Sequence, residues 1–348
     1  MAHGGEHEPA GSATTSVTPV ERTSLFSDSV TAPGQFPLSL GCAQLGNLHR
    51  PLSNEDAVSI VESAWEHGLR YFDTAPHYGL GLSERRLGQA LRGRPRDTFI
   101  VSTKVGRLLE SRSVDGTPNR DRLHHVPATH ERVWDFSRDG VRRSLEESLE
   151  RLGTDRVDVV YLHDPDDHAA EALDDAYPAL EELRAQGVVR AIGAGMNQSA
   201  LLTRFVRETD VDVVMIAGRL TLLDSSAADD LVPACSERGV GVAAAGVFNS
   251  GVLATLGSGE PVTYDYAPAP DAVLHRARRI QHLCHSYGTD LATVALQFPL
   301  RFGPVETITV GCDSAEQVAR NVTAAQAPIP EGLWEAINQL IDCQLYTR

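Results

Sequence analysis

A chain of 348 residues, of which 42% are hydrophobic and 22% are charged, can bury a large core and is typical of soluble globular proteins. The formal net charge is −16 and lysine and arginine form no cluster, which argues against nucleic acid and anionic membranes as partners. Length alone does not separate one domain from two, since single α/β barrels exceed ~250 residues.

The first 33 residues are rich in Ser, Thr, Pro, Gly and Glu and contain no apolar run long enough for a signal peptide. We expect residues 1–33 to form a disordered tail that precedes a single catalytic domain over residues 34–348. No later apolar stretch reaches the ~20 residues that span a bilayer. The expected location is the cytoplasm, and the sequence leaves open whether the chain forms a homo-oligomer.

After this tail, short runs of Val, Ile, Leu and Ala alternate with longer amphipathic segments. Such runs are typical of strands that are buried on both faces of a parallel sheet. In one amphipathic segment Val141, Leu145 and Leu149 share a face, and Gly153 ends the helical pattern. Eight strand and helix units predict an α/β fold, a closed (β/α)8 TIM barrel. The predicted strands are 38–46, 69–75, 99–105, 157–164, 188–195, 211–218, 240–247 and 306–311.

Two segments are longer than the barrel requires. Residues 106–136 follow the third predicted strand, and residues 249–270 follow the seventh. Both insertions come after the carboxyl end of a strand, where barrel enzymes place their active sites. We expect them to form a lid at the mouth, with Trp134 lining the substrate site. The alternative is that Trp134 only covers the outer wall of the barrel.

Four chemically active side chains stand at the ends of three neighbouring predicted strands. Asp73 and Tyr78 follow the second strand, Lys104 is near the end of the third, and His163 is near the end of the fourth. Because the carboxyl ends of barrel strands meet at one mouth, these side chains can converge. A structural alternative stays open for each residue taken alone, namely an Asp73–Lys104 ion pair and a hydrogen-bonded histidine at a strand end.

Together the four residues are suited to proton transfer around a phenol. The pKa of tyrosine is ~10 in water, and a neighbouring ammonium group lowers it by stabilising the phenolate. We therefore predict that Tyr78 transfers the proton and that Lys104 lowers its pKa. Asp73 would hold Lys104 in place, and His163 would bind the reacting oxygen.

The segments that carry these residues, "FDTAPHYGLGLSE", "STK" and "LHD", resemble the signature segments of the aldo-keto reductases. That family consists of barrel enzymes that depend on nicotinamide cofactors, and the resemblance covers roughly residues 36–345. It implies that Asp73, Tyr78, Lys104 and His163 form the catalytic tetrad. It also implies a dinucleotide that lies extended across the mouth, and the chain contains no GxGxxG fingerprint of a Rossmann dehydrogenase.

The resemblance also assigns residues to the cofactor, with three departures from the family pattern. Asn197 in "GAGMNQ" matches the asparagine that binds the nicotinamide carboxamide, but Met196 replaces a serine. Ala217 stands where many members have a glutamine, and Ala245 stands where many have a tyrosine stacked on the nicotinamide ring. We expect Phe248 to supply the missing aromatic contact. The residues that match the adenosine end of the cofactor site are Gly311, Cys312, Ser314, Gln317 and Asn321.

The expected adenosine end is a turn from a strand into a helix. Ser314 and Gln317 have the spacing of a capping box, and a helix N-terminus also favours a phosphate group, so both interpretations can hold. NADP-specific relatives resembling this chain carry a Lys-Ser pair and an Arg at the positions of Gly311, Cys312 and Gln317, which here offer no cation. We expect NAD to be preferred over NADP, unless Arg320 takes over this role.

The segments "YLHDPDDH", "GAGMNQ", "AGRLTLLD" and "FNSGVL" resemble a subgroup of this family, the bacterial sugar dehydrogenases of the D-threo-aldose 1-dehydrogenase and L-fucose dehydrogenase type. This resemblance implies that the chain oxidises an L-fucose-like aldose at C1 with NAD and produces a lactone. Arg219 and Asn249, together with Trp134, are expected to contact the sugar, unless a structural salt bridge holds Arg219.

Two other functions stay open within the family. The first is an NADPH-dependent reductase of aldehydes or ketones, including pyridoxal-type substrates. The second is a regulatory subunit that binds nicotinamide nucleotides tightly and turns over slowly.

A metal site is the remaining alternative for "HDPDDH" at residues 163–168. Metal-dependent barrel hydrolases usually draw ligands from several strands, the first predicted strand has no His-x-His, and Pro165 favours an exposed turn. We therefore predict that no metal is bound. The cysteines are widely spaced, lack a CxxC pattern and are expected to be reduced thiols: Cys42, Cys235, Cys284, Cys312 and Cys343.

Overall fold

The computed structural model describes residues 37–112, 121, 123–257, 259, 262–265 and 267–345, with side chains through residue 340. The predicted tail, residues 1–33, and its boundary with the domain lie outside these residues, as does the side chain of Cys343.

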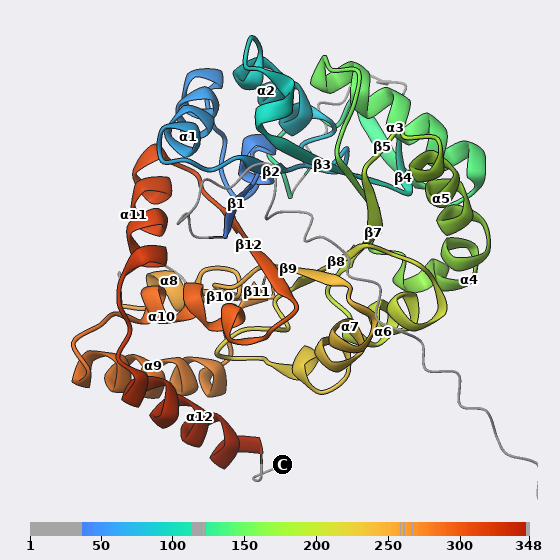
Figure 1. Cartoon of the computed structure of the whole chain (residues 1–348). Coiled ribbons are helices and arrows are strands. Elements are labelled where there is room, and N and C mark those ends of the chain that lie inside the picture. The colour runs from blue at the N-terminus through green and yellow to red at the C-terminus, as the bar shows by residue number, and fades with distance from the viewer. Residues whose placement is uncertain are drawn as a thin grey trace, which may run out of the picture.

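Eight parallel strands close into a barrel, which confirms the predicted fold (Figure 1). The ring closes where β1 pairs with both β2 and β12, so that Gly41 lies opposite Asp73 on one side and Gly311 on the other. Around the barrel the strands are β1 (Leu38–Gly41), β12 (Val305–Gly311), β9 (Gly241–Ala245), β8 (Val213–Ala217), β7 (Ala191–Met196), β6 (Val159–His163), β3 (Ile100–Val105) and β2 (Tyr71–Asp73).

Most strands are shorter than the sequence predicted. The apolar runs continue into the connecting turns, where the backbone no longer pairs with a neighbouring strand. The first predicted strand, 38–46, is the extreme case, because β1 ends at Gly41 and Gln44–Gly46 form a short 3-10 helix. Apolar composition therefore located the strands correctly but overestimated their length.

Helices surround the barrel, with α1 packed against α2 and α11, α2 against α3, and α6 against α7 (Figure 1). In chain order they are α1 (Asn54–Glu66), α2 (Leu82–Leu91), α3 (Arg138–Leu152), α4 (Ala169–Glu171), α5 (Tyr177–Ala185), α6 (Ser199–Glu208), α7 (Leu231–Arg238), α8 (Val252–Thr255), α9 (Asp271–Ser286), α10 (Leu291–Gln297), α11 (Ala315–Gln326) and α12 (Glu331–Leu345). None of the helices in the described part of the chain has the length and apolar character that a membrane crossing requires.

Local sequence explains where α3 begins and ends. The Ser137 side chain accepts a hydrogen bond from the backbone N–H of Gly140, which satisfies one of the free N–H groups in the first turn. Gly153 ends the helix with φ of 65°, a left-handed conformation that glycine adopts at little cost. Val141 and Leu145 on the predicted apolar face are buried. The helix expected at this place is confirmed.

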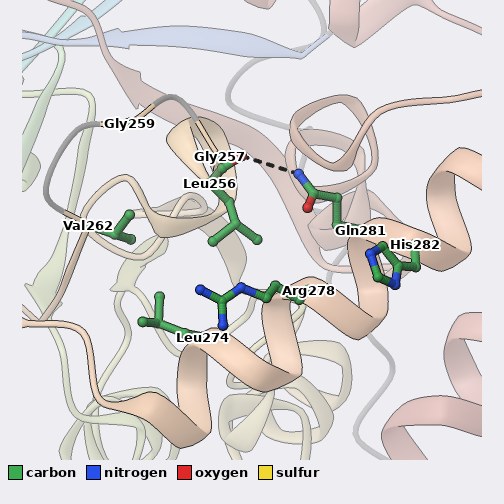
Figure 2. Close-up of a pocket in the computed structure, with 8 residues that line it drawn as sticks. All are labelled: Leu256, Gly257, Gly259, Val262, Leu274, Arg278, Gln281 and His282. Atoms are coloured by element: carbon green, nitrogen blue, oxygen red, sulfur yellow. Dashed lines mark hydrogen bonds between the residues drawn. The ribbon is translucent and has the colours of Figure 1, made fainter.

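The first insertion contains an antiparallel hairpin of β4 (Arg107–Ser111) and β5 (His130–Trp134), which the sequence analysis did not predict. The second contains α8 and a small hairpin of β10 (Thr263–Tyr264) and β11 (Ala267–Pro268). The second insertion and α9 also line an open pocket of about 530 Å³ (Figure 2). Gln281 donates a hydrogen bond across this pocket to the carbonyl oxygen of Leu256 at 3.2 Å. None of the four predicted tetrad residues lines this pocket.

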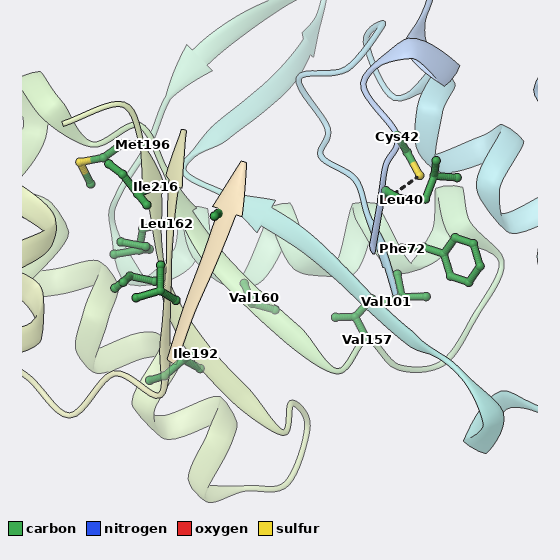
Figure 3. Packing of buried hydrophobic residues seen from close by; sticks show 14 of the residues in the cluster. Leu40, Cys42, Phe72, Val101, Val157, Val160, Leu162, Ile192, Met196 and Ile216 are labelled. Atoms are coloured by element: carbon green, nitrogen blue, oxygen red, sulfur yellow. Dashed lines mark hydrogen bonds between the residues drawn. The ribbon is translucent and has the colours of Figure 1, made fainter. Parts of the chain in front are cut away.

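Strand side chains alternate between the inside of the barrel and the layer of helices outside it. In β6, Val160 and Leu162 belong to the large cluster that also includes Phe72 and buried helix residues (Figure 3). Val159 and Tyr161, which alternate with them, belong to a separate cluster drawn from neighbouring strands, which fills the barrel interior. The same alternation directs the next residue in register, His163, towards the inside of the mouth.

Candidate active site

The structure brings the four predicted tetrad residues together at the carboxyl end of the barrel. Asp73 ends β2, Lys104 lies near the end of β3, and His163 ends β6, each in register with residues that face the barrel interior. Tyr78 lies in the turn between β2 and α2. Strand alternation and barrel closure therefore place side chains from distant parts of the sequence at one point.

Lys104 lies at the centre of this group. Its Nζ donates to Oδ2 of Asp73 at 2.6 Å, to Oη of Tyr78 at 3.1 Å and to the carbonyl oxygen of Thr74 at 3.1 Å. Lys104 and Asp73 are each 2% exposed. Burial opposes a charge on Lys104, but Asp73 and then Tyr78 outweigh it, and the pKa of Lys104 rises above its usual value. The lysine is therefore an ammonium ion.

Asp73 is itself held by a chain of buried hydroxyl groups. Ser102 Oγ donates to Oδ1 of Asp73 at 2.7 Å, and Tyr71 Oη donates to Ser102 Oγ at 3.0 Å. Both carboxylate oxygens are thus hydrogen bonded, one to the ammonium ion and one to the serine. This arrangement fixes the carboxylate, which in turn fixes Lys104 beneath Tyr78.

His163 lies across from Tyr78, with the two ring centroids 5.9 Å apart and the rings nearly perpendicular. Its pKa falls well below the usual value, first because it is buried and then because Arg107 and Lys104 are positively charged neighbours. The imidazole is therefore neutral near pH 7 and has one N–H group to donate.

The hairpin adds charged groups to the mouth that the sequence analysis missed. Arg107 of β4 forms an ion pair with Asp164, and its Nη1 lies 3.1 Å from Nδ1 of His77. Because a guanidinium group only donates hydrogen bonds, His77 Nδ1 accepts and the proton of the neutral ring lies on Nε2. Burial, followed by Arg107, lowers the pKa of His77 to about 2. His77 directly precedes Tyr78, which was the one signal available.

A second arginine joins the hairpin to the same rim. Arg132 of β5 donates to the carbonyl oxygen of His77 at 3.0 Å, lies 3.3 Å from Nδ1 of His124 and forms an ion pair with Asp121. Burial and then Arg132 lower the pKa of His124 to about 4. The rings of His77 and His124 are 5.1 Å apart. The rim beside Tyr78 therefore consists of neutral histidines held by two arginines.

Trp134, predicted to line the lid, lies on β5 with 42% of its surface exposed. Its ring stacks on Phe136 at 5.8 Å, and the guanidinium of Arg107 lies 4.1 Å from its centroid. The side chain thus lies at the rim and supports Arg107. Whether it contacts a substrate stays a prediction.

The two other predicted substrate residues lie at the second insertion. Arg219 donates to both carboxylate oxygens of Asp265, at 3.1 and 3.2 Å, and lies 3.7 Å from Asp224. The salt bridge that the sequence left open is therefore present, and it attaches the second insertion to the loop after β8. Asn249 is buried and donates from Nδ2 to the carbonyl oxygen of Gly218 at 3.1 Å. Its Oδ1 is buried without a partner among the described residues.

The predicted nicotinamide-side residues follow β7, β8 and β9. Asn197 comes directly after β7, and Phe248 is partly buried between the barrel helices and the cluster around α9 and α10. Ala217 and Ala245, the departures from the family pattern, lie opposite each other in the β8–β9 register. Two small side chains at adjacent strand ends leave this wall of the mouth without the bulk of a glutamine and a tyrosine.

The predicted adenosine end lies between β12 and α11. A Cβ atom on Gly311 would lie 2.3 Å from Oε1 of Gln44, an atom that is buried and unpartnered among the described residues. Ser314 caps α11 by accepting from the N–H of Gln317 at 3.2 Å. The Gln317 side chain accepts from the N–H of Asp313 rather than closing the predicted reciprocal box. Bare backbone, an unpartnered polar atom and a helix N-terminus together fit a dinucleotide.

Two contacts at this turn differ from simple expectation. The Asn321 amide donates to Cys312 Sγ at 3.2 Å, so one of its donors is used within the protein. Arg50, which the sequence analysis did not single out, places a cation at the turn, where its Nε donates to Asp313 Oδ2 at 2.9 Å. A carboxylate of opposite charge thus neutralises the cation.

Cys42, Cys235, Cys284 and Cys312 are free, buried thiols. In the described part of the chain, no group of three potential ligands could hold a metal ion.

Comparisons with known proteins agree with this architecture. The sequence model described as the Aldo/keto reductase family matches residues 37–342. The chain is 48% identical to D-threo-aldose 1-dehydrogenase of a Pseudomonas species over 301 residues, which are 85% of this chain and 91% of the relative. It is 38% identical to pyridoxal 4-dehydrogenase of Microbacterium luteolum over 317 residues, 86% of this chain and 92% of the relative. A solved aldo-keto reductase of Bacillus halodurans, in its holo form, aligns with a TM-score of 0.70 and 26% identity, over 90% of this chain and 96% of that one.

Proposed function

The chain belongs to the aldo/keto reductase family of oxidoreductases, and from this premise we propose that it oxidises an L-fucose-like aldose at C1 with NAD to give a lactone. The observation that carries the proposed chemistry is the position of Lys104 Nζ, 2.6 Å from the Asp73 carboxylate and 3.1 Å from the Tyr78 hydroxyl. The choice of an aldose is supported by the 48% identity to an aldose dehydrogenase.

In the proposed reaction the cyclic sugar presents C1 as a hemiacetal carbon. When bound, NAD would supply a hydride acceptor for the hydrogen on C1. Tyr78, as the phenolate, takes the proton of the C1 hydroxyl at Oη, and the C1=O bond of the lactone forms. The Lys104 ammonium stabilises the phenolate, and neutral His163 donates its N–H to the reacting oxygen.

The residues proposed to hold the dinucleotide lie along the mouth. Asn197, and Phe248 in place of the missing aromatic residue, would contact the nicotinamide half. The remaining residues lie at the turn before α11 and would hold the adenosine half: Gly311, Cys312, Ser314, Gln317 and Asn321, with Gln44 beside them. The buried Oε1 of Gln44 would gain a partner from the ligand.

We propose NAD rather than NADP because the turn before α11 offers little to a 2′-phosphate. Arg50 lies at this turn, and it is paired with Asp313. Bringing a doubly charged phosphate to that pair would place it beside the Asp313 carboxylate. We expect kcat/KM to be at least about tenfold higher with NAD. Equal or better values with NADP would show that Arg50 or Arg320 has been recruited to the phosphate.

A second candidate substrate is pyridoxal, favoured by the 38% identity to a pyridoxal dehydrogenase. Pyridoxal also forms an internal hemiacetal, so Tyr78 and His163 would perform the same proton transfer on it. The expected difference is in recognition, because pyridoxal presents an aromatic ring where an aldose presents several hydroxyl groups.

A substrate panel tests the proposal. L-fucose, L-galactose, D-arabinose and pyridoxal are each mixed with enzyme and either NAD or NADP at about pH 8.5, and the absorbance of the reduced cofactor is followed. We expect NADH from at least one aldose and little from simple alcohols. No NADH from any aldose, together with rapid NADPH-dependent reduction of an aromatic aldehyde, would instead establish an aldehyde reductase. Tight NAD binding without turnover of any substrate would indicate a regulatory subunit.

A further inference from the structure

Asp164 lies at the mouth of the barrel, one residue after His163. Its backbone N–H donates to the carbonyl oxygen of Gly195 at 2.9 Å, which extends the pairing of β6 with β7 and fixes the residue. Its Oδ2 lies 3.7 Å from Nε2 of His163. A carboxylate therefore stands beside the imidazole that, in the proposed reaction, binds the reacting oxygen of the sugar.

Arg107 holds this carboxylate in place. One guanidinium nitrogen pairs with Asp164, another contacts His77 at 3.1 Å, and the plane lies 4.1 Å from the ring centroid of Trp134. Only 13% of the arginine side chain is exposed. Contacts with three different partners leave the guanidinium group little freedom to move.

The Asp164–Arg107 pair has hydrogen-bonding capacity to spare. Among the described residues, Nε of Arg107 is buried without a partner, and Oδ1 of Asp164 accepts no hydrogen bond. The Asp164 side chain is 32% exposed, so a ligand in the mouth can reach it. Oδ1 of Asp164 is therefore an acceptor to which a hydroxyl group of a ligand can donate. An ion pair that served only to fasten the hairpin would not need this unused capacity.

We propose that Asp164, held in place by Arg107, recognises the hydroxyl group on C2, the carbon next to the reacting C1, with Oδ1 of Asp164 accepting a hydrogen bond from that hydroxyl group. The inference rests on the proposed oxidation of an aldose and names the part of the site that selects it. Oxygens on neighbouring sugar carbons are about one hydrogen-bond length apart, so an oxygen bound to His163 brings the next one to Asp164. A substrate without that hydroxyl leaves Oδ1 of Asp164 desolvated and without a hydrogen-bond donor, and polar sites of this kind reject such substrates strongly.

The test combines a substitution of Asp164 with the removal of the C2 hydroxyl group from the substrate. D-arabinose and 2-deoxy-D-ribose differ only in the hydroxyl at C2, and kcat and KM are measured for each with NAD and wild-type enzyme or Asp164→Asn. We expect the wild type to prefer D-arabinose by at least about 100-fold in kcat/KM. The variant should lose most of this preference, mainly through a higher KM for D-arabinose, so that the ratio of the two kcat/KM values falls by at least about tenfold.

Two further variants make the result interpretable. If Asp164→Asn folds poorly, Asp164→Ser replaces it in the test. Asp164→Ser also removes the charge, so it should lose the preference for D-arabinose in the same way. Asp212→Asn breaks a comparably buried aspartate–arginine pair with Arg184 at the opposite end of the barrel. It should lower stability but leave the preference for the C2 hydroxyl unchanged.

The outcomes separate this inference from the proposed function. Suppose the wild type oxidises aldoses, but Asp164→Asn lowers kcat/KM equally for D-arabinose, for 2-deoxy-D-ribose and for the NADH-dependent reduction of benzaldehyde. This result would overturn the inference, because the residue would then only position His163. Absence of any aldose oxidation by the wild type would overturn the proposed function and the inference with it. We expect Asp164→Asn to lower kcat/KM for D-arabinose far more than for 2-deoxy-D-ribose or benzaldehyde.

Discussion

Replacing Tyr78 by phenylalanine removes a single oxygen atom, and we expect it to affect turnover far more than stability. That oxygen accepts a hydrogen bond from Lys104 Nζ at 3.1 Å. Without it the ammonium ion keeps Asp73 at 2.6 Å and the carbonyl oxygen of Thr74 at 3.1 Å, so its charge stays paired. One lost hydrogen bond lowers the free energy of unfolding by about 1 kcal/mol.

The expected effect on catalysis is much larger. A positioned general acid–base group typically contributes a factor of about 10² to 10⁴, which is roughly 3 to 5 kcal/mol of activation free energy. Because Tyr78 is proposed to move the proton, kcat of Tyr78→Phe should fall by at least about 100-fold. The residues proposed for the adenosine half lie at another part of the mouth, so the Kd for NAD should stay within about threefold of wild type.

Three measurements check this prediction. The rate of NADH formation gives kcat with the best aldose of the panel, calorimetric titration gives the Kd for NAD, and urea unfolding gives stability. Tyr287→Phe is the control, since Tyr287 is 40% exposed and distant in sequence from the site. If Tyr78→Phe kept more than about a tenth of the wild-type kcat while binding NAD normally, Tyr78 would not be the proton-transfer residue.

Three further predictions concern stability. Lys104→Met leaves a buried carboxylate without its cation and should cost about 3 to 5 kcal/mol in urea unfolding, well beyond the effect of Tyr78→Phe, as well as activity. Gly106→Ala places a methyl group 2.2 Å from a buried phenylalanine ring at φ of 101°, whereas Gly153→Ala has a positive φ but open space around it. The first should therefore lower the unfolding midpoint clearly more than the second, and equal effects would contradict the close contact. The lowered pKa values of His77 and His124, about 2 and 4, mean that the unfolded chain binds more protons below the usual value of 6.5. Stability should therefore fall as pH falls from 6.5 to 5, by up to about 1.4 kcal/mol per pH unit for each histidine, and unfolding midpoints that do not change between pH 7 and 5 would refute the burial argument.

The barrel and the convergence of the four tetrad residues could be predicted because both depend on local patterns. Apolar runs mark buried parallel strands, and the closed barrel brings all their carboxyl ends to one mouth. Once Asp73, Lys104 and His163 were assigned to strand ends, their proximity followed from topology. The segment after Tyr71 delivers Tyr78 on a short turn, which leaves few other positions for it.

The rim could not be predicted in the same way. Arg107, at the start of the hairpin of β4 and β5, contacts His77 across 30 residues and Asp164 across 57. The side chains of β5 are half-buried or exposed, so the sequence shows no apolar periodicity that would predict this hairpin. The sequence allows a salt bridge for Arg219 but does not identify its partner, because Asp265 lies 46 residues away in the second insertion.

The two insertions are attached to the barrel in a similar manner, and this suggests how chemistry and selectivity are divided in the chain. Arg107 joins the first insertion to Asp164, and Arg219 joins the second to the loop after β8. Asp73, Lys104 and His163, by contrast, lie on strands whose backbones are hydrogen bonded around the whole ring, and Lys104 contacts Tyr78 from there. Partly exposed ion pairs contribute little to the stability of the fold and are screened by salt, so changes in the insertions disturb the barrel only weakly. The strand residues can therefore stay fixed while the rim varies, so we expect the proposed proton transfer to depend on the strands and the choice of substrate to depend on the insertions.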